Sequence, residues 1–101
     1  MKNYRELEQK ILDYADDNDL LSRDNLLGQT NKILRDTEAL HLASRMNSQG
    51  RKEFITTGNK IVKVEDEVKS NFGKLLFNLI ILAELQGVSL EEELEIAYKN
   101  K

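Results

Sequence analysis

The segment Ser70–Gly87, "SNFGKLLFNLIILAELQG", decides the fold, because its apolar residues cover most of the circumference of a helix. From Leu75 to Leu85 only Asn78 and Glu84 are polar. This run is shorter than the roughly 20 apolar residues that a membrane-spanning helix needs. It therefore predicts a helix surrounded by protein, and a chain of 101 residues has little else with which to cover it. We expect part of this helix to meet a second subunit, in a homodimer or a dimer of dimers; a central helix buried within a monomer is the alternative.

Periodic apolar patterns on both sides of this segment, without a single proline, predict an all-α fold of about four helices. The long apolar helix should run from about Glu65 to Gln86, with Gly87 as the left-handed residue that ends it. A last helix should start after Ser89, which forms a capping box with Glu92. The residues of that last helix predicted to face inward are Leu94, Ala97 and Tyr98.

Two further helices and a hairpin are predicted upstream. Apolar residues recur at helical spacing from Tyr4 to Tyr14, and "DDND" ends that helix. A second helix should begin at the N-cap Ser22 and stop at "NSQG". Between it and the apolar helix, β-branched and aromatic residues flank Gly58–Asn59, which predicts a short β-hairpin insertion over 52–64.

Composition limits the function. The chain is expected to form one domain, 1–101, with 15 Lys and Arg against 18 Asp and Glu and a net charge of −3. No concentrated basic face is evident, so we expect no nucleic-acid partner, and the short apolar run predicts no membrane partner. The absence of cysteine excludes disulfides and thiolate chemistry. Together with an N-terminus that lacks an apolar signal region, it predicts a cytoplasmic location.

Two blocks of the sequence carry a family resemblance. The block "NLLGQTNKILRDTEALHLA", Asn25–Ala43, corresponds to a helix that carries an E-x-x-E motif. The block "GKLLFNLIILAELQGVSLEEELEIAYKN", Gly73–Asn100, has in order the glycine, apolar helix, glycine turn and capped terminal helix that accompany an E-x-x-D motif. Together they resemble the MazG-like all-α NTP pyrophosphohydrolases. The resemblance implies a MazG-like helical bundle completed by oligomerisation.

The family's chemistry, as the resemblance implies it, depends on four carboxylates that gather Mg²⁺ to polarise NTP phosphates and activate a water. In this sequence the E-x-x-E pair falls on Asp36 and Ala39, and the E-x-x-D pair falls on Asn71 and Lys74. Alanine offers no ligand and the lysine ammonium repels a metal ion. We therefore expect no catalytic residue, no metal site and no cofactor. A binding or regulatory role would replace hydrolysis, with a nucleotide or a protein as partner.

Two other functions stay open from the sequence. The acids Glu65, Asp66 and Glu67 could act with Asp36 in an active, divergent Mg²⁺-dependent NTP pyrophosphohydrolase. Their position at a helix start, where the helix dipole favours negative charge, explains them more simply. The hairpin could instead make the protein an interaction scaffold for another protein.

Other polar residues are weaker candidates. We expect Lys74 to occupy the space of the missing metal and to pair with Asp36, directly or through water. His41 has no partner within one turn, so a packed or hydrogen-bonded structural role is predicted. No phosphate-binding glycine motif is present. Four cations that could meet phosphates, but are explained as solvated side chains, are Lys32, Arg35, Lys99 and Lys101.

Overall fold

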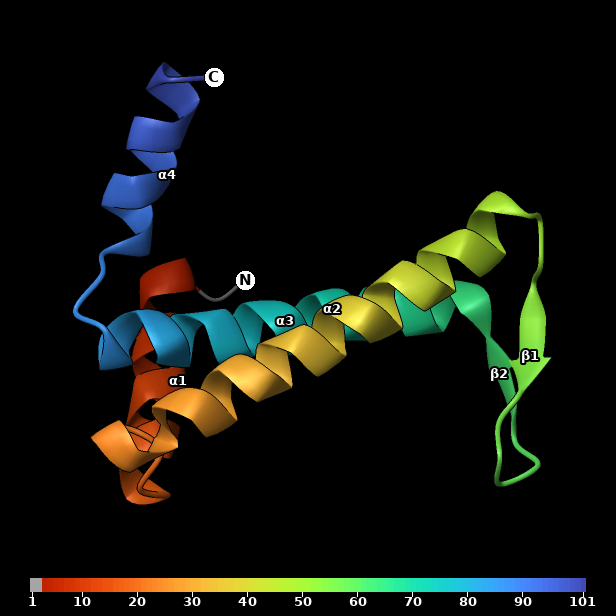
Figure 1. The fold of residues 1–101 in the computed structure, drawn as a ribbon, viewed down its shortest axis with the longest axis horizontal. Helices are drawn as coiled ribbons and strands as arrows, with labels where there is room; N and C mark the ends of the chain where they lie inside the picture. The colour runs from red at the N-terminus through yellow and green to blue at the C-terminus, as the bar shows by residue number, and fades with distance from the viewer. Residues whose placement is uncertain (1–2) are drawn as a thin grey trace. The chain divides into compact units, whose positions relative to one another are not determined.

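A computed structural model describes residues 3–101, so positions 1 and 2 of the expected domain lie outside the described residues (Figure 1). The fold is mostly helical with one small hairpin, which confirms the expected all-α class with its hairpin insertion. The elements in chain order are α1 (Tyr4–Asp17), the 3₁₀ turn η1 (Arg23–Asn25), α2 (Leu26–Ser48), β1 (Glu53–Ile55), β2 (Ile61–Lys63), α3 (Val64–Leu85) and α4 (Leu90–Lys99). They divide into two compact units: unit 1 contains residues 3–30 and 77–101, and unit 2 contains residues 31–76.

Three helices end in the same backbone arrangement, with one residue in the left-handed region: Asp19 at φ 57°, Gly50 at φ 75° and Gly87 at φ 65°. In each case the amide after that residue reaches back five positions, as in a Schellman motif. These bonds join Leu20 N to Ala15 O (2.8 Å), Arg51 N to Met46 O (3.0 Å) and Val88 N to Ala83 O (2.8 Å). The helix ends predicted at "DDND", "NSQG" and Gly87 are therefore confirmed.

Helix starts follow local capping. The Ser89 hydroxyl accepts from the Glu92 amide at 3.3 Å, as predicted for α4. The Ser22 hydroxyl also accepts a hydrogen bond, from the backbone amide of Asp24 at 3.4 Å, but the turn that Ser22 caps is η1. The α-helix itself begins later than predicted, at Leu26, because the Asn25 side chain donates to the Leu20 carbonyl at 2.8 Å and holds a tighter turn.

The core of unit 1 is small and includes one polar side chain. Its buried residues are Ala15, Gln29, Ile80, Ile81 and Ala83. Beside this core the rings of Tyr14 and Phe77 meet edge to face, with centroids 5.7 Å apart. The start of α2 and the end of α3 are joined here by hydrogen bonds from Gln29 to Asn78. Unit 1 therefore combines apolar packing with a satisfied buried amide.

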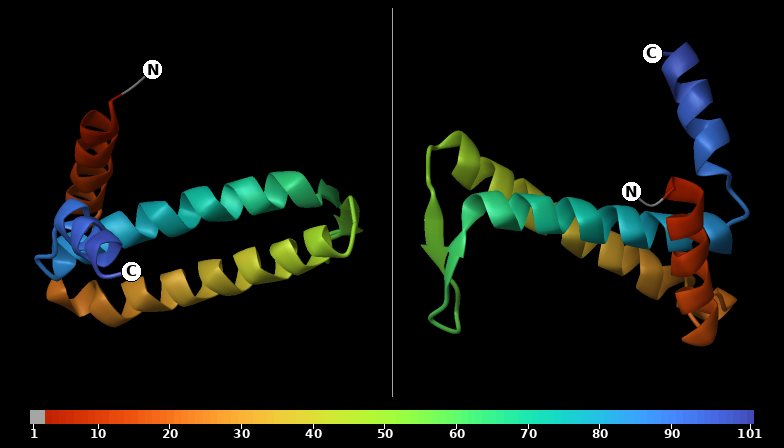
Figure 2. Two further views of the ribbon diagram at one scale, coloured as in Figure 1. Left: turned by 90° about the horizontal axis from the view of Figure 1, so that it is seen from above. Right: turned by 180° about the vertical axis from the view of Figure 1, so that it is seen from behind.

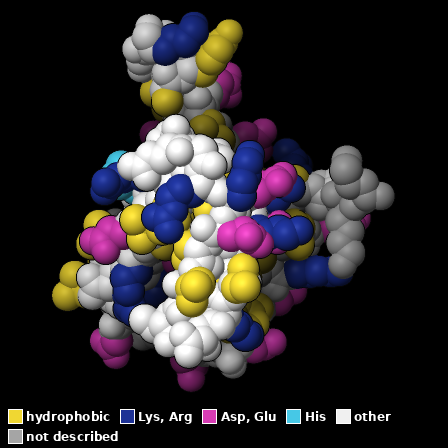
Figure 3. Space-filling view, turned by 90° about the vertical axis from the view of Figure 1, so that its right-hand side faces the viewer, with side chains coloured by type: hydrophobic (Ala, Val, Ile, Leu, Met, Phe, Trp, Pro, Cys, Tyr) yellow, Lys and Arg dark blue, Asp and Glu magenta, His cyan; other side chains and the backbone are white. Residues whose placement is uncertain are grey.

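Unit 2 consists of the remaining lengths of α2 and α3, which run antiparallel and side by side and are connected through β1 and β2 (Figures 1 and 2). The strands pair antiparallel, with Phe54 opposite Val62 on the half-buried face. The opposite face of the hairpin exposes Ile55 and its partner Ile61. Figure 3 shows the hydrophobic side chains on this side lying among intermixed basic and acidic ones.

The expectation that α4 turns an apolar face inward is wrong for this chain. Leu94 is 70% exposed, Tyr98 is 68% exposed, and α4 contains no buried residue. The helix forms because Ser89 caps it and acids occupy its first turn, and neither effect requires a packed face.

The helices of residues 3–101 are too short or too polar, taken singly, to span a membrane. Only α3 and α4 taken together, as a sharply bent pair, satisfy the length and composition test.

Candidate functional site

Unit 2 contains a cavity of about 150 Å³, which we call the Asn71 cavity. Residues of α2, β1 and α3 line it: Ala39, Leu42, Ala43, Met46, Phe54, Glu67 and Asn71. Ala39 is one of the positions that the resemblance aligns with E-x-x-E, and Asn71 is one of those that it aligns with E-x-x-D. The fold brings these two residues to one cavity.

The Asn71 side chain is one of the two polar side chains that line this cavity, beside Glu67. The residue is only 4% exposed, and its amide has no hydrogen-bond partner within residues 3–101. None of the fully enclosed side-chain nitrogens and oxygens in that range lacks a partner, so the Asn71 amide keeps some accessible surface, and the residue lines the cavity. An amide both donates and accepts hydrogen bonds. It can therefore recognise a polar group that enters.

Glu67 is the one carboxylate of the Asn71 cavity. It lies four residues before Asn71, which places both side chains on one face of α3. Of the three consecutive acids considered in the sequence, Glu65 and Asp66 are exposed and do not line the cavity. Sequence reasoning treated the three alike and missed Glu67. The four-residue spacing from Asn71 was the signal that could have separated it.

The other two motif positions do not line the cavity. Asp36 is half-buried and Lys74 is exposed. No ion pair joins Lys74 to any of the described residues, so the expected direct contact with Asp36 is not formed; an exposed ammonium is solvated by water instead. Nowhere in residues 3–101 do three or more His, Cys, Asp or Glu side chains gather in a way that could hold a metal ion.

The remaining sequence candidates lie apart from the Asn71 cavity. A packed or hydrogen-bonded histidine was predicted at position 41; in the single chain His41 is exposed, so it is not packed. Lys32 is half-buried and Arg35 is exposed. On α4, Lys99 pairs with Glu95 at 3.2 Å. The Lys101 ammonium lies 4.2 Å from the centroid of the Tyr98 ring, in a cation–π contact.

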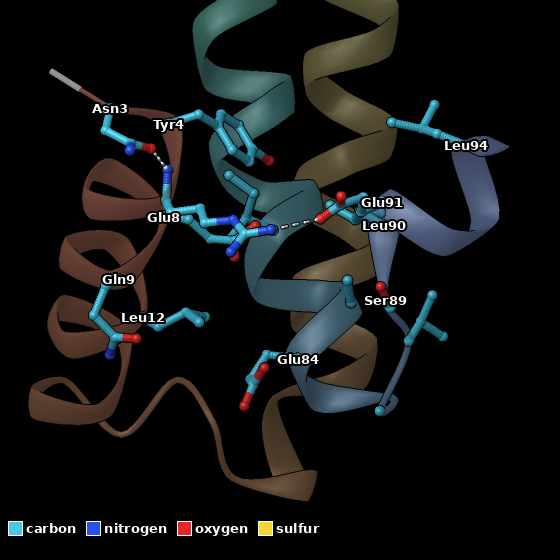
Figure 4. A pocket seen from close by; sticks show the side chains of 15 residues that line it. Asn3, Tyr4, Glu8, Gln9, Leu12, Glu84, Ser89, Leu90, Glu91 and Leu94 are labelled. Atoms are coloured by element: carbon cyan, nitrogen blue, oxygen red, sulfur yellow. Dashed lines mark hydrogen bonds and ion pairs between the residues drawn. The ribbon is translucent and has the colours of Figure 1, made fainter.

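Unit 1 carries a wider depression of about 950 Å³, which we call the α1–α4 groove (Figure 4). Tyr4, Glu8 and Leu12 of α1 form one wall. The end of α3 and the start of α4 form the rest, including Ile80, Ala83, Glu84, Leu90 and Leu94. Arg5 and Glu91 meet across it at 3.6 Å, but both are exposed, so this pair contributes about 0 to 1 kcal/mol at most.

Comparison with known proteins yields one partial likeness. No family model and no solved structure matches the chain. The DNA replication and repair protein RecF of Staphylococcus carnosus (strain TM300) is 31% identical over 81 residues, which are 80% of this chain and 22% of RecF. The chain thus spans about a fifth of the length of the curated relative that it matches. A likeness to so small a part of RecF does not assign the chain to a family.

Proposed function

We propose that this protein is a MazG-like helical protein that no longer hydrolyses NTPs and instead binds a small organic ligand in the Asn71 cavity. One observation carries the proposal: Ala39 and Asn71, two of the four positions at which the family has metal-binding carboxylates, line a cavity in which Glu67 is the one acid. A single carboxylate beside an amide is a poor site for a divalent ion, which prefers several oxygen ligands.

The lining residues define the chemistry of the ligand. Leu42, Met46 and Phe54 supply an apolar wall, and Glu67 supplies a negative charge with no cation among its neighbours in the cavity. A buried or half-buried charge favours an opposite charge next to it. The best occupant is a compact molecule with an apolar body and a primary ammonium or amidinium group. A nucleotide could enter this cavity only with the amino-bearing edge of its base toward Glu67. Its phosphates would have to stay outside the cavity, because the Glu67 carboxylate repels them.

Binding is tested with benzamidine and its neutral isostere benzamide, each titrated into isotopically labelled protein and followed by NMR. We expect resonances of Phe54 and Asn71 to shift with benzamidine at lower concentration than with benzamide. Glu67→Gln should abolish this preference, whereas Glu65→Gln, the same change on the exposed side of α3, should keep it. Equal affinity for the two probes, or no shift with either, would refute the ligand class.

The loss of hydrolysis is tested with a panel of NTPs and dNTPs in the presence of Mg²⁺ or Mn²⁺. We expect no pyrophosphate release above background. Thermal unfolding should also be insensitive to Mg²⁺. Release that disappears in Asp36→Ala or Glu67→Gln would instead establish the active, divergent hydrolase.

We further propose that the protein is a homo-oligomer. Unit 2 leaves large apolar side chains more than half exposed on both of its helices: Leu34, Leu42, Phe72 and Leu76. Large apolar side chains left this exposed favour burial against another protein surface.

The likeness to RecF favours a second candidate, a part in DNA replication or repair. A net charge of −3 argues against direct contact with phosphates. Fluorescence anisotropy with single-stranded and double-stranded DNA tests it. Binding at physiological salt would favour this second candidate over the ligand-binding proposal.

A further inference from the structure

The connection between α2 and α3, which forms the hairpin, is a basic element in an acidic chain. It contains Arg51, Lys52, Lys60 and Lys63 against the single acid Glu53, whereas the whole chain has a net charge of −3. All five of these residues are exposed, and basic side chains lie beside hydrophobic ones on this side of the molecule (Figure 3). None of the four cations forms an ion pair within residues 3–101. The hairpin can therefore offer positive charge to an acidic partner.

The hydrogen-bonding pattern leaves the outer edge of β2 open. The amides of Val64 and Thr56 each donate across the hairpin at 2.9 Å, to carbonyls of the opposite segment. Hydrogen-bonded and non-hydrogen-bonded positions alternate along an antiparallel pair. The N–H and C=O of Ile61 and the N–H of Lys63 therefore point away from β1. An exposed strand edge of this kind is a template for a further strand.

The pairing within the hairpin shows which side chains fit beside β2. An acid and two large apolar residues of β1 face it: Glu53 lies opposite Lys63, Phe54 opposite Val62 and Ile55 opposite Ile61. Cross-strand pairs of opposite charge and pairs of β-branched or aromatic side chains are favourable. Lys60, whose partner on the other strand is Thr56, adds a second cation. An extended segment with the pattern acid–apolar–apolar–acid would therefore complement positions 60–63, and this pattern reads the same in both strand directions.

A second copy of this chain fits the edge less well. Its β1 would supply only one of the two acids, Glu53. Each such contact would also leave another β1 edge and another β2 edge free, so the pairing would not close. Its β2 carries lysine and no acid. The charges therefore favour a segment of a different protein.

We propose that the free edge of β2 binds an extended acidic segment of another protein, which joins the hairpin as a third strand. The segment places acids beside Lys60 and Lys63 and apolar side chains beside Ile61 and Val62. Backbone hydrogen bonds hold the added strand, and its alternating side chains select it. No residue of β2 lines the Asn71 cavity, so the inference goes beyond the ligand-binding proposal and does not depend on it.

The probe is a synthetic peptide that contains Glu-Val-Val-Glu, titrated into the isotopically labelled full chain and followed by NMR. We expect the amide resonances of Ile61 and Lys63 to shift. A peptide that contains Val-Glu-Glu-Val has the same composition and charge but places its acids beside Ile61 and Val62, so it should bind about fivefold more weakly. Methylating the peptide nitrogens that face β2 should abolish binding without any change in the protein.

Two protein variants identify the edge. Ile55 and Ile61 are both 69% exposed, lie opposite each other and keep their N–H groups out of the bonds between the strands. Ile61→Pro removes an N–H from the β2 edge and Ile55→Pro removes one from the β1 edge. Only Ile61→Pro should abolish binding. The double variant Lys60→Glu/Lys63→Glu should lose the acidic peptide and bind a Lys-Val-Val-Lys peptide instead.

The peptide variants decide the proposal even where a proline variant fails to fold. Equal binding of the two acidic peptides, or no binding of either, would overturn strand addition. Binding that is lost in Ile55→Pro and kept in Ile61→Pro would overturn the choice of β2. Hairpin resonances that respond to single-stranded DNA and not to the peptide would replace the peptide site with a phosphate-binding one. Resonances that respond to protein concentration alone would make a second copy the occupant.

Discussion

Gln29 is fully buried, and its amide is satisfied on both sides. The Gln29 Nε2 donates to the backbone carbonyl oxygen of Asn78 at 2.9 Å and to the Asn78 side-chain Oδ1 at 3.0 Å. The Gln29 Oε1 accepts a hydrogen bond from the Asn25 Nδ2 at 3.3 Å. We predict that Gln29→Ala lowers the free energy of unfolding by about 2 to 4 kcal/mol, because it leaves partners unpaired and opens a cavity. Gln9→Ala, an exposed glutamine with one hydrogen bond, should cost less than about 0.5 kcal/mol. The free energy of unfolding of both variants is measured by urea denaturation. An equal decrease for Gln29→Ala and Gln9→Ala would contradict the importance of the buried amide.

Tyr4, in the wall of the α1–α4 groove, should give the protein an alkaline sensitivity. Burial raises the pKa of Tyr4 above its ordinary value of 10.0, and the negative charge of Glu8 and a hydrogen bond to Glu8 raise it further. The folded state therefore holds the phenolic proton more tightly than the unfolded chain does. This contribution to stability is complete below the ordinary pKa and is lost as the pH rises through the raised value.

We therefore predict that Tyr4→Phe removes part of the fall in stability at alkaline pH, measured by thermal unfolding across that range. Glu8→Gln should shift the titration of the Tyr4 phenol, followed by ultraviolet absorbance, toward lower pH. A phenol that titrates identically with and without the Glu8 carboxylate would contradict this coupling.

At the scale of one element, two glycines of the same stretch should respond oppositely to alanine. Gly87 ends α3 at φ 65°, where a Cβ is strained, so Gly87→Ala should destabilise by about 1 kcal/mol. Gly73 lies within α3, and a Cβ placed there meets nothing within 4 Å, so Gly73→Ala should stabilise by about 0.5 to 1 kcal/mol. Both changes are measured by chemical denaturation. A destabilising Gly73→Ala would indicate that another subunit packs closely on that surface.

At the scale of the whole molecule, the exposed part of the apolar helix predicts assembly. Leu76 is 58% exposed and Ile81 is fully buried, although both belong to the same apolar run. We predict that light scattering shows at least a dimer at micromolar concentration. The Leu76→Asp variant should stay folded but dissociate, whereas the Ile81→Asp variant should unfold, because Ile81 is buried within the chain. Circular dichroism distinguishes the two variants. A compact, stable wild-type monomer in dilute solution would disprove the expected assembly.

Local features were predictable because their causes lie within a turn or two of chain. The Ser89 cap, the left-handed Gly87 and the hairpin around Asn59 follow from neighbouring residues, and the structure has all three. The start of α2 was misplaced because the Asn25 side chain stabilises η1 before the helix begins. Within the candidate site, Ala39 and Asn71 were singled out only by the resemblance to the MazG-like proteins.

The sequence by itself determined the helices and most of their ends, since capping and periodicity are local properties of the chain. The tertiary structure alone decided that Glu67 and Phe54 join Asn71 at one cavity, because that cavity is formed by side chains from three elements. It also decided that α4 and His41 are exposed. An amphipathic pattern shows that a face favours burial, but only the arrangement of the other elements determines whether this chain or a second one covers it.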